Sequence, residues 1–158
     1  MLPIIERENG LLFYPSQYEG EEESPAAIYT GATPRQQALP AADYLLREGR
    51  TRFFLTGSAY IYSRTTNAIL RGYLASKNIS AKDIEEHYVS DDENWRALID
   101  RIAAFAAKGQ TAIVSTLSGD ANVPFYRELA RHGIKPQTTP VMSLSIGEAE
   151  LPAFGGAN

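Results

Sequence analysis

The sequence has no cysteine, and its 158 residues include only two histidines, His87 and His132. Without cysteine the chain has no disulfide, no thiolate metal site and no cysteine nucleophile. The two histidines lie far apart in the sequence without neighbouring ligand patterns, so a metal site would need carboxylates alone. We therefore expect neither a metal nor a cofactor, and we interpret both histidines as structural residues.

Long apolar runs and clusters of basic residues are missing too. No run approaches the roughly 18 to 20 apolar residues that a membrane-spanning helix needs, and residues 1–10 carry neither the basic nor the apolar region of a secretion signal. Lysine and arginine are scattered through a chain of net charge -4, which predicts that nucleic acid is not a partner. With 44% hydrophobic residues, the chain can bury a core and fits one domain of ordinary size.

The first part of the chain contains short predicted elements. Residues 1–10 resemble the end of a helix that stops at Gly10, so we expect the chain to begin inside a longer protein. The apolar segments 11–14 and 27–31 predict two short strands joined by a polar loop.

A helix is predicted to begin after Thr33. The sequence TPRQ has a capping threonine, a proline at the first helical position and a glutamine at the third. We expect this helix to end at Gly49 and to be kinked by Pro40, which lacks a backbone donor.

From residue 52 onward, strand and helix patterns alternate regularly. The predicted strands cover 52–56, 84–89, 111–116 and 140–145, and the predicted helices cover about 61–77, 93–108 and 121–132. Such alternation with short connections predicts an α/β fold, in which a parallel sheet with right-handed crossovers is flanked by helices.

Parallel strands place their carboxyl-terminal ends along one edge of the sheet, where α/β proteins bind ligands. The sequences SAYIYS, SDD, LSGD and SIGE follow the four predicted strands and should gather there. The side chains that they offer are Tyr60, Tyr62, Ser118, Asp120 and Ser145. Hydroxyl groups, a carboxylate and backbone amides suit a small neutral polar solute, and tyrosine rings provide apolar walls.

The same edge lacks the parts of common catalytic and phosphate sites. It has no G-x-S-x-G motif, no histidine in reach of Ser118 and no glycine-rich phosphate loop, so we expect that the protein is not an enzyme. Structural roles stay open as alternatives. Tyr60 and Tyr62 could pack the helix start onto the sheet, Asp120 could cap the helix that follows, and Trp95 fits a core position.

Several segments together resemble one protein family along nearly the whole chain. They are LLFYPSQYEGEE, YTGATPRQQALPAADYLL, FFLTGSAYIYSRTTNAILRGYL, VSTLSGDANVPFYRELARHGI and PVMSLSIGEAEL, in collinear order. These segments resemble the substrate-binding proteins of urea and short-chain amide ABC transporters, which are type I periplasmic binding proteins. That group also includes branched-chain amino acid binders and the amide sensor of the aliphatic amidase operon. The resemblance is strongest at YP-x-Q-YEG, YIY-x-R-T-x-N and GDANVPFY.

The resemblance implies a fold of two Rossmann-like α/β lobes with the ligand held in the cleft between them. By this likeness, residues 1–32 are the closing segment of the N-terminal lobe and residues 33–158 are most of the C-terminal lobe. The chain would then be less than half of such a protein. Seven residues match the ligand contacts of the amide-binding members: Tyr14, Ser16 and Gln17 from one lobe, and Tyr60, Tyr62, Ser118 and Ser145 from the other.

The chain departs from the family pattern at three positions. Ala59 and Ser63 stand where members usually carry Asp and Pro, and Arg35 replaces a common Asn. These changes bear on the ligand more than on the fold. The resemblance implies a periplasmic or lipid-anchored receptor that binds urea or a short-chain amide and delivers it to the permease subunits of an ABC importer. A cytoplasmic amide-sensing regulator and a branched-chain amino acid binder are alternatives with the same fold.

Overall fold

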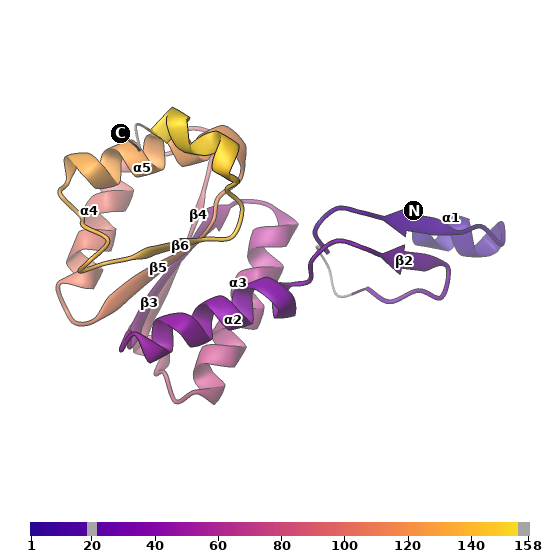
Figure 1. Cartoon of the computed structure of the whole chain (residues 1–158), viewed down its shortest axis with the longest axis horizontal. Coiled ribbons are helices and arrows are strands. Elements are labelled where there is room, and N and C mark those ends of the chain that lie inside the picture. Colours follow the sequence, from indigo (N-terminus) through magenta and orange to yellow (C-terminus); the bar gives the residue numbers. More distant parts are fainter. Residues whose placement is uncertain (19–21, 155–158) are drawn as a thin grey trace.

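The computed structural model describes residues 1–18 and 22–154, so Glu19 and Gly20 of the YEG motif lie outside the described residues. Its largest part is a four-stranded parallel sheet in the order β4-β3-β5-β6 (Figure 1). The strands are β3 (Arg52–Ser58), β4 (Ile84–Val89), β5 (Thr111–Thr116) and β6 (Val141–Ser143). The predicted parallel α/β sheet is confirmed. β6 is shorter than predicted, and Ser145 therefore lies in the loop that follows it.

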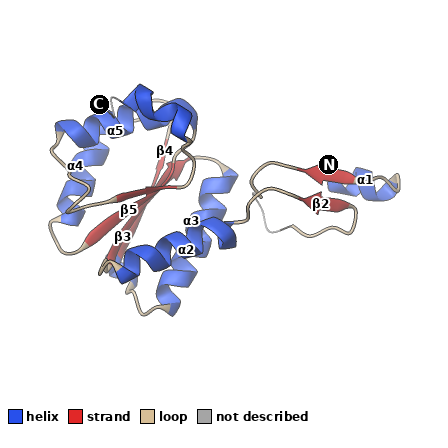
Figure 2. Cartoon of the chain, in the orientation of Figure 1, coloured by secondary structure: helices blue, strands red, loops and turns tan. Residues whose placement is uncertain are grey.

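Helices cover both faces of this sheet (Figure 2). On one face lie α2 (Pro34–Arg47) and α3 (Ile61–Ser76), and on the other lie α4 (Trp95–Ala106) and α5 (Asn122–Arg131). Short 3-10 helices connect or follow these elements: η1 (Ala81–Asp83), η2 (Gly119–Ala121) and η3 (Glu148–Phe154). Among the described residues, no helix combines the length and the apolar composition needed to cross a membrane.

Successive residues of the central strands belong to two different cores. Phe53 and Leu55 contact the core beneath α2 and α3, whereas Phe54 contacts the core beneath α4 and α5. In β5, Val114 and Ile113 divide in the same way. All residues of β5 are buried, as expected for a parallel strand covered on both faces.

The predicted helix start after Thr33 is confirmed. The Thr33 backbone N–H donates to Gln36 Oε1 at 2.9 Å, which is one half of a capping box. α2 ends at Arg47, and Gly49 follows with a φ of 78°, in the left-handed region that glycine adopts after a helix. Pro40 lies on an exposed side of α2 and does not interrupt the helix.

The N-terminal segment, residues 1–33, is a smaller arrangement that extends to one side of the sheet in Figure 1. α1 (Leu2–Arg7) precedes β1 (Leu12–Tyr14), and β1 pairs in parallel with β2 (Ala27–Tyr29). The two predicted short strands are thus confirmed. None of the described residues of this segment is buried, so it has no core of its own.

Candidate functional site

A hollow of about 770 Å³ lies at the carboxyl-terminal edge of the sheet. Its residues end or follow β3 and β4, follow β5, or come from the starts of α4 and α5. They are Ser58, Ala59, Tyr60, Val89, Ser90, Asp91, Trp95, Ser118, Asp120, Ala121 and Pro124. The predicted gathering of SAYIYS, SDD and LSGD at one edge is thus confirmed. We call this feature the edge hollow.

Hydrogen bonds between strand ends hold the floor of the edge hollow. The Ser118 backbone N–H donates to Ser58 Oγ at 3.0 Å, which ties the end of β5 to the end of β3. The Ala59 N–H donates to the Val89 carbonyl at 3.3 Å, which ties β3 to β4. The lining is therefore supported by the sheet itself.

The loop after β5 is held by Asn122 and not by Asp120. The buried Asn122 Nδ2 donates to the carbonyls of Leu117 and Gly119, each at 3.1 Å. Asp120 lies in η2 and makes no capping hydrogen bond to α5, so the capping role considered for it is wrong. Its carboxylate is exposed and lines the edge hollow.

The polar lining of the edge hollow consists of hydroxyl groups and carboxylates. Three serines and the carboxylates of Asp91 and Asp120 line it, and no lysine or arginine does. This lining accepts hydrogen bonds from N–H groups and disfavours anions. The rings of Tyr60 and Trp95 add flat apolar surface. Within residues 1–18 and 22–154, no cluster of three His, Cys, Asp or Glu could hold a metal ion.

Sequence reasoning did not propose Trp95 and Asp91 as site residues. Trp95 was expected in the core; it packs against Phe125, with ring centroids 6.4 Å apart, but is only partly buried and also lines the edge hollow. Asp91 is the second residue after β4. Its position after a strand end was the signal that could have found it.

Gln17 joins the N-terminal segment to the sheet. Its Nε2 donates to Gln37 Oε1 in α2 at 2.8 Å, and it lies 3.4 Å from the Leu144 carbonyl after β6. These contacts are part-buried. The Gln17 side-chain amide is thus hydrogen-bonded within the chain, and its predicted contact with a ligand stays a prediction.

Tyr62 lies next to this junction and is only 6% exposed. Burial raises the pKa of the Tyr62 phenol, and interactions with the side chains of Ser145, Thr66 and Gln17 partly oppose the rise. The buried Ser145 Oγ and Thr66 Oγ1 make no hydrogen bond of standard geometry among the described residues. The Tyr62 phenol is their polar neighbour, so the hydrogen bonds of this buried cluster are only partly formed.

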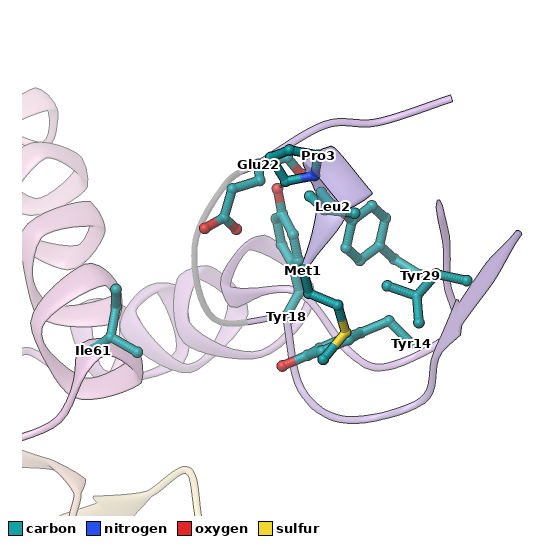
Figure 3. A pocket seen from close by; sticks show the side chains of 9 residues that line it. Met1, Leu2, Pro3, Tyr14, Tyr18, Glu22, Tyr29 and Ile61 are labelled. Atoms are coloured by element: carbon teal, nitrogen blue, oxygen red, sulfur yellow. Dashed lines mark hydrogen bonds between the residues drawn. The ribbon is translucent and has the colours of Figure 1, made fainter. Parts of the chain in front are cut away.

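Tyr14 lies in a second pocket, of about 400 Å³, on the N-terminal segment. Its ring centroid is 5.9 Å from that of Tyr29, and Tyr18 contacts Tyr29 edge-on at 4.7 Å. Figure 3 shows these three tyrosines gathered on the N-terminal segment, with Ile61 apart from them on α3. Because Ile61 follows Tyr60, the pocket and the edge hollow share the start of α3 as a wall.

Ser16 is exposed, and its backbone lies close to that of Gly31, which follows β2. A Cβ atom on Gly31 would lie 1.7 Å from the Ser16 carbonyl oxygen, so this approach requires glycine. Nearby, the Tyr18 N–H donates to the Ala32 carbonyl at 3.1 Å. Ser16 is thus held near the junction with the sheet, outside the lining of the edge hollow.

The structure places the seven predicted ligand contacts in three groups. Tyr60 and Ser118 line the edge hollow, Gln17, Tyr62 and Ser145 meet in the buried cluster, and Tyr14 and Ser16 belong to the N-terminal segment. Their roles in binding a ligand stay predictions.

Comparison with known proteins gives one family and several related folds. A family model described as a periplasmic binding protein domain matches residues 1–158. A solute-binding protein of an ABC transporter from R. palustris, in complex with 4-hydroxybenzoate, is similar with a TM-score of 0.80 and 18% identity, over 98% of this chain and 42% of that chain. One from Rhodopseudomonas palustris HaA2, in complex with p-hydroxybenzoic acid, has a TM-score of 0.82 and 18% identity, over 98% and 42% of the two chains.

A third structure is more distant. The amino acid ABC transporter substrate-binding protein from Pseudomonas fluorescens Pf-5 has a TM-score of 0.59 and 15% identity, over 88% of this chain and 37% of that chain. At such identities the likeness to all three structures concerns the fold alone. This chain spans less than half the length of each of them.

Proposed function

Because this chain belongs to the periplasmic binding protein domain family, we propose that it contributes one lobe to a two-lobe solute receptor of an ABC importer. In this proposal residues 1–32 close the N-terminal lobe, and residues 33–158 form most of the C-terminal lobe. The solute lies in the cleft between the lobes, against the edge hollow, and is bound without being chemically changed. The receptor works in the periplasm, free or lipid-anchored, and hands its solute to permease subunits.

The solute is a small neutral molecule rich in N–H groups, and urea or a short-chain amide fits best. The observation that carries this choice is the lining of the edge hollow, which combines hydroxyls with Asp91 and Asp120 and has no basic side chain. Urea offers one carbonyl acceptor and up to four N–H donors, which such a lining can pair with in a cleft that excludes water. A solute that leaves these groups unpaired once the lobes have closed over them is rejected.

Solutes with a carboxylate are the competing class. The two R. palustris proteins are complexes with an aromatic acid, and the P. fluorescens protein is described as an amino acid receptor. In this chain a carboxylate would lie beside Asp91 and Asp120, where like charges repel. The lining hydroxyls, the Trp95 indole N–H and backbone N–H groups, such as those at the start of α3, would offset only part of that repulsion.

The buried cluster around Tyr62 supports the same choice. Ser145 Oγ and Thr66 Oγ1 are buried beside the Tyr62 phenol and make no hydrogen bond of standard geometry among the described residues. Buried polar groups are normally paired, so hydroxyls whose hydrogen bonds are only partly formed favour a polar ligand that completes them. A neutral amide can both donate to and accept from hydroxyl groups.

Isothermal titration calorimetry on the two-lobe protein that contains this chain tests the proposal. We expect urea or acetamide to bind and 4-hydroxybenzoate and leucine to give no heat. Binding of 4-hydroxybenzoate with no response to the neutral amides would overturn the assignment of the solute class. Tyr60→Ala should weaken binding, whereas Tyr44→Ala, a matched change on a half-exposed tyrosine of α2, should not.

The 158-residue chain alone sharpens the two-lobe part of the proposal. Lobe closure supplies contacts from both sides of the solute, so one lobe holds only part of them. We expect weak or undetectable binding of urea to this chain in the same titration. Micromolar binding to the chain alone would contradict the two-lobe account.

A further inference from the structure

A chain of charged and polar contacts connects α4 to the wall of the edge hollow. His87 Nε2 lies 3.0 Å from Glu93 Oε2, and His87 Nδ1 lies 3.2 Å from Arg101 Nη1. Arg101 also pairs with Glu85. The side chains of Glu93 and His87 are 11% and 23% exposed, so their contact is largely shielded from water.

The hydrogen-bond donors in these contacts determine which ring nitrogen of His87 carries a proton. A guanidinium group only donates hydrogen bonds, so His87 Nδ1 accepts from Arg101 and carries no proton. The ring is therefore neutral, and its Nε2–H donates to the Glu93 carboxylate. The charged groups that face the ring are Glu85 from β4, Arg101 from α4 and Glu93 from the loop, whereas β3 contributes the uncharged Thr56 opposite it.

Glu93 also contacts the loop that lines the edge hollow. The Ser90 backbone N–H donates to the same Glu93 oxygen at 3.4 Å, and Ser90 Oγ donates to Asp92 Oδ1 at 2.9 Å. Ser90 and the neighbouring Asp91 are lining residues of the edge hollow. One carboxylate oxygen thus joins His87 to the backbone that carries Asp91.

We propose that Glu93 and His87 are positioning residues that hold the loop between β4 and α4 in its solute-binding form, and that a proton on His87 releases it. A second proton turns Nδ1 from an acceptor for Arg101 into a donor that faces a cation, so this contact is lost. The charged ring then draws the Glu93 carboxylate away from the Ser90 N–H. The receptor would hold its solute less tightly in acidic surroundings.

The solute-binding role of the loop rests on the proposed function, but the coupling between His87 and Ser90 does not. It can be measured without a solute by NMR of the isotope-labelled 158-residue chain, across the range of about pH 5 to 8 in which histidine changes charge. We expect the Ser90 and Asp91 amide signals to move with the same midpoint as the His87 ring signals. The His87→Gln variant keeps a side-chain N–H donor for Glu93 and cannot titrate, so the movement should disappear while the signals stay near their high-pH positions.

His132→Gln is the matched control. His132 contacts Asp100 and Glu128, away from this loop, so the variant should keep the movement of the Ser90 and Asp91 signals. Glu93→Ala removes the connecting carboxylate and should abolish the movement while His87 still titrates. Ser90 and Asp91 signals that stay constant with pH in the parent chain, or that still move in His87→Gln, would overturn the proposal. A failure of solute binding with the coupling intact would instead count against the proposed function.

Discussion

The two regions of this molecule are stabilised in different ways. The sheet region, residues 34–154, buries both faces of its central strands, whereas the N-terminal segment buries none of its described residues. Phe13 and Ile28 lie opposite each other on β1 and β2 and are 62% and 43% exposed. Apolar residues in a strand pattern therefore do not by themselves make a core, because a core also needs covering elements on the strand's face.

The largest expected effect comes from the same substitution made in each region. Phe54→Ala removes a fully buried ring at the centre of β3, and we expect it to lower the free energy of unfolding by about 3 to 5 kcal/mol. Phe13→Ala removes a mostly exposed ring from β1 and should change it by less than about 0.5 kcal/mol. Urea denaturation of both variants measures the difference.

A milder variant protects this comparison against complete unfolding. If Phe54→Ala does not fold, Phe54→Leu should fold with an intermediate loss, because it leaves a smaller cavity. Losses of similar size for the Phe54 and Phe13 variants would contradict the view that only the sheet region carries a core.

The second comparison is between two glycines of the sheet region, one at a tightly packed position and one on the surface. A Cβ atom on Gly57 would lie 2.2 Å from Thr116 Oγ1 and 2.6 Å from Ser63 Cβ, so α3 must shift away from the sheet in Gly57→Ala. We expect a loss of about 1 to 3 kcal/mol in the free energy of unfolding. Gly72→Ala on the exposed surface of α3 has open space and should gain about 0.5 to 1 kcal/mol.

Thermal unfolding followed by circular dichroism would rank these two variants against the parent chain. If Gly57→Ala were as stable as the parent, the close approach of Ser63 to the sheet would not constrain the start of α3. In that case the bond from Ser63 Oγ to the Thr116 carbonyl, at 2.9 Å, would be adaptable.

Elements of the fold could be predicted from the sequence where the signal lies in residues close together along the chain. The start of α2 was readable because Thr33 and Gln36 are three residues apart and form the cap between themselves. The strand order was not readable, since it depends on packing between distant segments. The edge hollow could be located only because parallel strands must end along one edge, which is a rule of topology.

Only the structure shows which of the predicted site residues lie together. Tyr60 and Tyr62 are two residues apart, yet Tyr60 is 52% exposed at the edge hollow and Tyr62 is 6% exposed. The sequence does not show that separation because it arises from contacts such as Gln17 to Leu144, across 127 positions. Asp120 was misjudged as a cap from its position before a helix, but it lies within η2, and the N-cap of α5 is Ala121.

The smallest expected effect lies at the junction of the two regions, where Tyr62 meets Gln17. Burial raises the pKa of Tyr62, so above about pH 10 the unfolded chain loses the phenolic proton while the folded chain keeps it. Stability is therefore unaffected below that pH and falls as the pH rises through the raised pKa. Burial also raises the pKa of Tyr88 and Tyr126, so the parent chain should lose stability in alkali through several tyrosines.

Tyr62→Phe removes one of these contributions. Urea midpoints measured between about pH 8 and pH 11, a range that spans ordinary tyrosine titration, should fall less steeply for this variant than for the parent. Tyr44→Phe, on a side chain that is 50% exposed, should follow the parent curve. If Tyr62→Phe followed the parent curve as well, Tyr62 would have to be open to water, and the N-terminal segment would then not seal the junction. Because Gln17 is the residue of that segment beside Tyr62, the slope of this curve reports how firmly the weakly packed region is held against the packed one.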